Sequence, residues 1–273
     1  MRRKISTIAL NVLLIVLGLV TVYPFVWMLS SSFKQNKEIM ALEQHLLPQF
    51  FTVKNYITMN SRFNFMRFFA NSLLVTIVVT LAVIYTSTIC GFVLSKYKFK
   101  GRNLLFGFVL STMMIPWCVT IIPKYSMIQN FGWLDSYKAL IIPALFSGFG
   151  IFNMKQHIAT LPDEILEAAR IDGADEFFIF HRIIFPMAKN GISSIAIFQF
   201  LWTWEDYLWP YLVISAKEKQ LLSVGLKMFS GQYSTDYGAL FAATAISIIP
   251  VLLIYVVFQK QFIAGVASAA VKG

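Results

Sequence analysis

Residues 160–186 read TLPDEILEAARIDGADEFFIFHRIIFP, and this stretch decides how the rest of the chain is interpreted. It is the one long interval in the C-terminal two thirds where acids and bases crowd together, and uncharged apolar runs flank it on both sides. A proline followed by two acids predicts a helix over 162–171, because proline suits the first turn and acids favour the positive end of the dipole. Asp172–Gly173 predicts a turn, since glycine tolerates positive φ. With a second helix from about Ala174 to just before Pro186, we expect a helix-turn-helix elbow.

The two halves of this elbow are expected to differ in their surfaces. In the second helix Phe177, Phe180 and Ile184 are spaced i, i+3, i+7, which predicts one apolar face. In the first helix the simplest interpretation of Glu167 and Arg170 is a surface ion pair, worth about 0.2 to 0.5 kcal/mol. The elbow would then be apolar on one side and charged elsewhere.

The composition predicts an integral membrane protein. Of the 273 residues, 58% are hydrophobic and 13% are charged, and the mean hydropathy is +0.68, whereas soluble domains carry about 25% charged residues. The net charge of +10 does not indicate a nucleic-acid partner, because the basic residues are spread between apolar runs; loops facing an anionic lipid leaflet explain it better. The uncharged run of 29 residues from Ile5 to Phe33 is too long for a secretory signal and reaches a full span.

Uncharged runs of about 20 residues predict six transmembrane helices and an all-α fold. Pro116 should kink the third, the fourth is short, and two acids interrupt the fifth. Residues 1–68 would hold the first helix and a polar extracytoplasmic loop, residues 69–265 the main transmembrane domain, and residues 266–273 a cytoplasmic tail. The expected spans are 7–30, 69–94, 104–123, 139–154, 191–214 and 237–259.

The distribution of positive charge predicts the orientation of these spans. Six spans place both termini on one side, and the loops on that side carry most of the Lys and Arg residues, including four within 95–102. Since short cytoplasmic loops are enriched in Lys and Arg, we expect both termini and the elbow to be cytoplasmic.

The elbow also resembles the EAA loop of permease subunits in binding-protein-dependent ABC importers, written E-A-A, three residues, G, nine residues, I-x-L-P. Every spacer agrees, although Phe185 stands where the family usually has Leu. In that family the loop docks on the ATPase subunit, so the resemblance implies an ATPase-coupling role for this segment. The residues concerned are Glu167, Ala168, Ala169, Asp172, Gly173, Ile183 and Pro186.

Further stretches resemble the carbohydrate-uptake branch of these permeases, in particular its maltose-transporter-like second permease. Residues 202–210, WTWEDYLWP, are similar to its W-x-W-N-x-F-L-W-P run, and Val224-Gly225-Leu226 to the V-G-L that follows. The resemblance covers roughly residues 70–273. Two departures are Glu205, which replaces the usual Asn, and Asn190, which stands where a second proline often follows the elbow.

The resemblance implies a sugar or oligosaccharide importer of which this chain forms half of the translocation pathway. The implied partners are a second homologous permease, an ATP-binding cassette ATPase dimer, an extracytoplasmic solute-binding protein, the sugar and the membrane lipid. The chain itself would need no cofactor, because ATP is bound by the ATPase subunits. Its location would be the inner or plasma membrane of a prokaryote, as a multi-pass protein.

Within the fifth span, Glu205 and Asp206 lie beside Trp202 and Trp204 and are candidates for the substrate pathway. Aromatic faces stack on pyranose rings, carboxylates accept hydrogen bonds from hydroxyl groups, and acids within a span are costly and mark pathways. The alternative is that both acids lie at the outer interface within an aromatic belt. They also leave open a proton-coupled carrier in which this pair titrates.

Catalytic and metal sites are not expected. The sequence contains no phosphate loop, no G-x-S-x-G motif and no H-E-x-x-H motif, so energy would come from another subunit or from an ion gradient. His157 and His181 flank the elbow without partners at metal-ligand spacing and are interpreted as surface or packing residues. A membrane-embedded enzyme ranks last among the possible functions.

Overall fold

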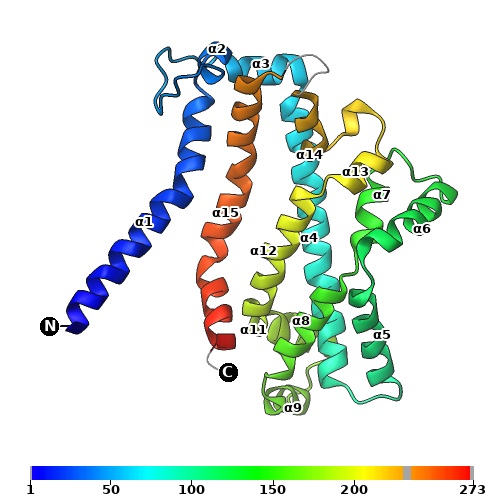
Figure 1. The fold of residues 1–273 in the computed structure, drawn as a ribbon. Coiled ribbons are helices and arrows are strands. Elements are labelled where there is room, and N and C mark those ends of the chain that lie inside the picture. The colour runs from blue at the N-terminus through cyan, green and yellow to red at the C-terminus, as the bar shows by residue number, and fades with distance from the viewer. Residues whose placement is uncertain (1, 230–234, 271–273) are drawn as a thin grey trace. The chain divides into compact units, whose positions relative to one another are not determined.

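The computed structural model describes residues 2–229 and 235–270, and its regular elements are helices (Figure 1). The chain divides into two compact units. One consists of residues 1–67 and 225–249, and the other of residues 68–224 and 250–273. The prediction of an all-α polytopic membrane protein is confirmed.

The first unit begins with α1 (Arg2–Ser31), a 30-residue helix whose apolar side chains are largely exposed, as a lipid-facing helix requires. The polar segment after it folds into α2 (Asn36–Ile39) and α3 (Lys54–Phe63). Asn55 holds this segment together, because its amide donates to the backbone oxygens of Ser32 (2.8 Å) and Lys34 (2.7 Å). This unit also contains η4 (Leu226–Phe229).

The second unit is built on α4 (Phe65–Lys96), which agrees with the predicted second span. Its close neighbour is α8 (Gly148–Ala159). A Cβ added to Gly91 would lie 2.7 Å from Met154 Cβ and 2.8 Å from the backbone nitrogen of Lys155. Helices α4 and α8 therefore approach closely enough that only glycine fits at this position.

The third predicted span is not one kinked helix, and that expectation was wrong. It consists of α5 (Arg102–Met114) and α6 (Trp117–Asn130), whose axes differ by 102°. Ile115 between them is extended, at φ −81° and ψ 118°, because a residue before proline disfavours the helical region. Pro116 therefore ends one helix and begins another.

The fourth and fifth predicted spans are also interrupted. The fourth consists of α7 (Lys138–Ile141), η1 (Ile142–Ala144) and α8. The fifth breaks after α12 (Lys189–Glu205), where Asp206 is extended, and resumes as α13 (Leu208–Val213). The connection onward contains η3 (Lys217–Lys219) and α14 (Leu222–Gly225).

The sixth predicted span agrees with the structure, because residues 237–259 of α15 (Tyr237–Ala270) are long and apolar enough to cross a membrane. Three helices of the described chain pass this test unbroken, and up to five pass if bent pairs are counted. By length and composition the described residues thus support three to five candidate spans, where the sequence predicts six. In the predicted tail, residues 266–270 continue α15, and residues 271–273 lie outside the described chain.

Candidate functional site

The elbow is present where the sequence predicts it. Its first half is α9 (Asp163–Ile171), preceded by Pro162 as the capping residue, and Gly173 turns the chain with φ +82°. The second half comprises α10 (Glu176–Phe178), the π-helical segment η2 (Ile179–Ile184) and α11 (Phe185–Met187). It therefore continues through Pro186 and does not end before it. Asp175, whose carboxylate accepts from the Phe178 N–H at 2.6 Å, caps its start.

The π-helical segment changes which side chains are buried. Ile179, Phe180 and Ile184 are buried, whereas 72% of Phe177 is exposed. The predicted apolar face was wrong for Phe177, because a π-helix bonds i to i+5 and its side chains no longer follow the α-helical spacing. The second half of the elbow is thus fixed in the hydrophobic core of its unit.

The first half of the elbow is anchored on one side and open on the other. Leu166 is buried and Ala169 packs partly against the core, while Glu167 and Ala168 are exposed. Ile171 is 86% exposed. Of the remaining predicted coupling residues, Asp172, Gly173 and Pro186 are exposed and Ile183 is half-buried.

An ion pair joins the two halves of the elbow, and it is not the predicted pair with Glu167. Arg170 Nε lies 2.8 Å from Glu176 Oε1, and the Tyr97 hydroxyl donates to the other oxygen of Glu176. Burial, followed by the neighbouring Glu176, raises the pKa of Tyr97 to about 12. The loop after α4 is therefore bonded to the elbow.

Lys96 makes a second connection between α4 and the elbow. Its ammonium donates to the Leu161 carbonyl and to Asp163 Oδ1, both at 2.5 Å. This hydrogen bond from Lys96 holds the pKa of Asp163 below its ordinary value. The sequence indicated a basic loop here but did not single out Lys96 or Tyr97, since nothing in a charge count shows that two segments 65 residues apart meet.

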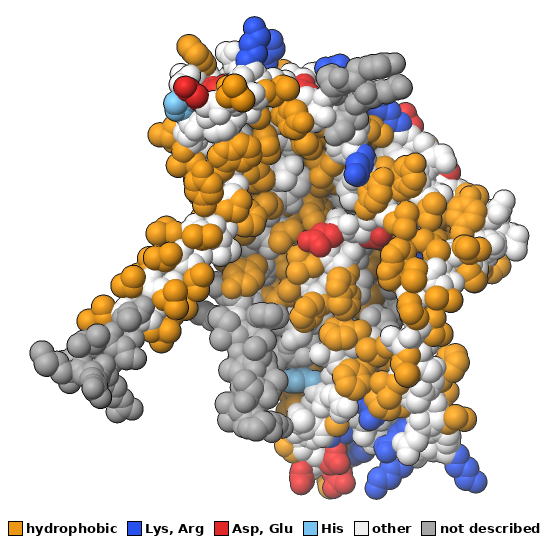
Figure 2. All heavy atoms as spheres, viewed as in Figure 1, with side chains coloured by type: hydrophobic (Ala, Val, Ile, Leu, Met, Phe, Trp, Pro, Cys, Tyr) orange, Lys and Arg blue, Asp and Glu red, His pale blue; other side chains and the backbone are white. Residues whose placement is uncertain are grey.

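These connections lie at one end of the second unit. Figure 1 shows α9 at the same end as the loop between α4 and α5, with α6 and α13 away from it. Basic and acidic side chains gather at this end, below a broad apolar band (Figure 2). This pattern is that of a membrane protein whose charged loops leave the lipid at one face.

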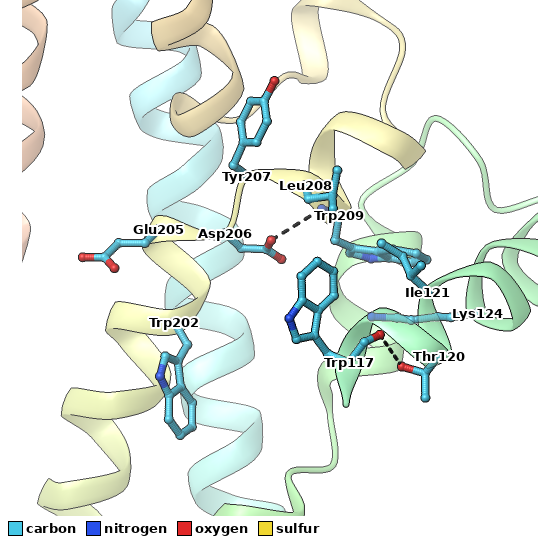
Figure 3. A pocket seen from close by; sticks show the side chains of 10 residues that line it. All are labelled: Trp117, Thr120, Ile121, Lys124, Trp202, Glu205, Asp206, Tyr207, Leu208 and Trp209. Atoms are coloured by element: carbon cyan, nitrogen blue, oxygen red, sulfur yellow. Dashed lines mark hydrogen bonds between the residues drawn. The ribbon is translucent and has the colours of Figure 1, made fainter. Parts of the chain in front are cut away.

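Farther from the elbow, a cavity of about 760 Å³ opens where two helices break. It lies between the start of α6 and the junction of α12 with α13 (Figure 3). Irregular backbone inside a membrane domain is tolerated where it is buried or lines a water-filled space. Its lining consists of Trp117, Thr120, Ile121, Lys124, Trp202, Glu205, Asp206, Tyr207, Leu208 and Trp209.

Three of the four predicted pathway residues line this cavity and the fourth does not. Trp202, Glu205 and Asp206 belong to its wall. Trp204 is buried instead and packs edge-on against Phe69, with the ring centroids 5.6 Å apart, a separation typical of aromatic pairs. In Figure 3 the Asp206 carboxylate faces the Trp209 side of the cavity and Glu205 points the opposite way. The two acids therefore do not form a facing carboxylate pair.

Lys124 and Trp117 are among the cavity residues that sequence reasoning missed. The Lys124 ammonium lies 4.0 Å from the centroid of the Trp209 ring, a cation–π contact. Trp209 is itself fixed, since its indole N–H donates to the Ala139 carbonyl at 3.0 Å. Only the break at Pro116, which starts α6, brings Lys124 to this wall.

Comparison with known proteins identifies the family. Residues 84–268 match the family described as the binding-protein-dependent transport system inner membrane component. The chain is 33% identical to the arabinooligosaccharides transport system permease of Bacillus subtilis, covering 99% of this chain and 97% of that one. It is 34% identical to the diacetylchitobiose uptake system permease of Streptomyces coelicolor (97% and 88%), and 34% identical to the sn-glycerol-3-phosphate transport system permease of Shigella flexneri (75% and 74%).

A solved structure supports the same fold. A chain of a bacterial ABC transporter involved in the import of the acidic polysaccharide alginate superimposes with a TM-score of 0.86 at 24% identity, over 95% of this chain and 97% of that one. Taken with the sequence matches, this shows that the chain belongs to the family of inner membrane components of binding-protein-dependent transport systems, as a multi-pass ABC importer permease.

Proposed function

We propose that this chain is one of two permease subunits in an importer for a sugar or oligosaccharide, driven by a separate ATPase that docks on the elbow. A second, similar permease completes the pathway, and an extracytoplasmic binding protein delivers the substrate. Both termini and the elbow face the cytoplasm in this arrangement. The relatives named for arabinooligosaccharides and diacetylchitobiose support the substrate class.

The docking proposal rests on one observation. The inner side of the elbow is buried in the core, whereas its outer side is exposed. The second half is buried in the core, whereas Glu167 and the strongly exposed Ile171 face outward on α9. An exposed apolar side chain rimmed by charge is typical of a protein contact site. When the ATPase moves the elbow, the buried half and the bonds from α4 would transmit that movement to the spans.

The family assignment favours this importer over a proton-coupled carrier. Such a carrier was suggested by Glu205 and Asp206, whose side chains diverge in the structure (Figure 3). ATP hydrolysis then belongs to another subunit, and this chain contributes pathway and coupling without binding a cofactor.

The docking proposal is tested with Glu167→Lys and Gly173→Asp in the complete importer. Both positions are exposed, so the variants should reach the membrane in normal amounts, lose uptake and release the ATPase during purification. Glu218→Lys, a matched charge reversal at an exposed site in η3, should retain both. Normal uptake and normal ATPase retention by Glu167→Lys would contradict the docking site.

A further inference from the structure

The cavity at the two helix breaks has the composition of a carbohydrate site. Trp117 and Trp202 line it and are 62% and 50% exposed, so their indole surfaces are available to a ligand. Asp206 lies at the extended junction after α12 and supplies carboxylate oxygens to the same wall. Aromatic faces beside a hydrogen-bond acceptor suit a ring that is apolar on its faces and hydroxylated at its edge.

The charge of the lining indicates which carbohydrates fit. The wall carries two carboxylates, from Glu205 and Asp206, and one ammonium, from Lys124, which gives a formal net charge of −1. The ammonium is already engaged, because it lies over the Trp209 ring, 4.0 Å from the ring centroid. An anionic ligand would therefore meet uncompensated negative charge and find no free cation among the lining residues.

Two contacts fix the junction that carries Asp206. The backbone N–H of Trp209 lies 3.5 Å from Asp206 Oδ1, and Ser223 Oγ donates to the Asp206 backbone carbonyl at 2.6 Å. These contacts hold the junction in place while leaving the carboxylate facing the cavity (Figure 3). The site is thus built into the fold and does not depend on the conformation of one exposed side chain.

We propose that this cavity is a substrate site for a neutral sugar, with Trp117 and Trp202 stacking on the ring and Asp206 accepting from its hydroxyls. Glu205, which lines the cavity but points away from Asp206 (Figure 3), disfavours anionic sugars through its charge and makes no direct contact with the ring. The inference rests on the proposed function and deepens it, since it names the substrate class and the residues of this subunit that select it. It separates this chain from relatives named for anionic cargo, such as the sn-glycerol-3-phosphate permease.

The experiment uses the complete importer in liposomes with its binding protein. Four labelled probes are offered: arabinobiose and diacetylchitobiose, which are neutral, and digalacturonate and sn-glycerol-3-phosphate, which are anionic. We expect ATP-dependent uptake of at least one neutral probe and of neither anionic probe. If the ATPase responds to the binding protein, uptake of an anionic probe, or of none of the four, overturns the neutral-sugar assignment alone. Uptake that needs no ATP would instead overturn the proposed function.

Variants assign the roles of individual residues. Trp117→Ala and Trp202→Ala should each slow uptake of the neutral probe about fivefold, the loss of one stacking contact, whereas Phe108→Ala, which removes an exposed aromatic on α5, should not. Glu205→Gln should raise uptake of an anionic probe about fivefold relative to the neutral one, the effect of removing one nearby charge; Glu218→Gln should leave this ratio unchanged. Unchanged uptake in both tryptophan variants, or an unchanged ratio in Glu205→Gln, would refute the corresponding role.

Discussion

Lys96→Met removes the connection that Lys96 makes between α4 and the elbow while keeping a side chain of similar length. The Lys96 side chain is 4% exposed, and its ammonium bonds to the Leu161 carbonyl and to Asp163. The Asp163 side chain is 72% exposed, so water screens that ion pair and it contributes little. The bond to the Leu161 carbonyl is the main loss.

The size of the effect follows from that carbonyl. A hydrogen bond from a charged donor contributes about 1.5 to 3 kcal/mol, and the carbonyl left behind loses its buried partner. We take about 2 kcal/mol for the variant, which corresponds to about a 30-fold increase in the local opening equilibrium. Because Lys96 anchors the chain just before α9, this opening should concentrate in residues 161–171.

Amide hydrogen exchange of the intact importer, followed by mass spectrometry, measures this change directly. Peptides covering 161–171 should lose about 30-fold of their protection in Lys96→Met, and uptake per ATP hydrolysed should fall, because a loosened elbow transmits less movement. Lys96→Arg should restore most of the protection. Lys100→Met, which removes an equal charge from an exposed position in the same loop, should match the wild type. Unchanged exchange in Lys96→Met, or equal losses in Lys100→Met, would refute the reasoning.

Three further predictions concern stability and are measured on the purified importer. The backbone N–H of Ala216 holds the pKa of Asp135 below its ordinary value. The ionised carboxylate therefore stabilises the fold above about pH 4, and this stabilisation is lost as the pH falls through the folded pKa. Asp135→Asn should reduce the drop in Tm between pH 6 and pH 3. Gly91→Val should cost about 3 kcal/mol or more, because its Cβ would lie 2.7 Å from Met154 Cβ, and a Tm equal to wild type would contradict this packing. Gly173→Ala should cost only about 1 kcal/mol, because the φ of +82° strains an alanine but no atom lies within 4 Å of the added Cβ. This cost should appear as about fivefold faster amide exchange in the turn.

The elbow was predictable because its signals are local. A proline with following acids starts α9, and a glycine with positive φ follows its end, so the expected and observed bounds of α9 differ by one residue at most. The bonds that brace it were not predictable, because Lys96 and Tyr97 reach across from another helix. The misplaced Phe177 has the same origin: the π-helical turn is set by how the segment packs, and the sequence periodicity does not reveal it.

The helix breaks could not be predicted from the sequence alone, and their positions explain why the cavity lies where it does. Pro24, Pro123 and Pro250 all remain inside continuous helices, whereas the chain bends by 102° at Pro116. A proline frees a backbone carbonyl in each case, so proline alone does not decide the outcome. In a membrane the freed groups need partners, and a break is stable where they meet protein or water. After Pro116 the first residues of the new helix and Lys124 line the cavity, so the break and the cavity occur at the same place. The position of the proposed sugar site is therefore a property of the packed helices, and the residues that line it become neighbours only once both helices have broken.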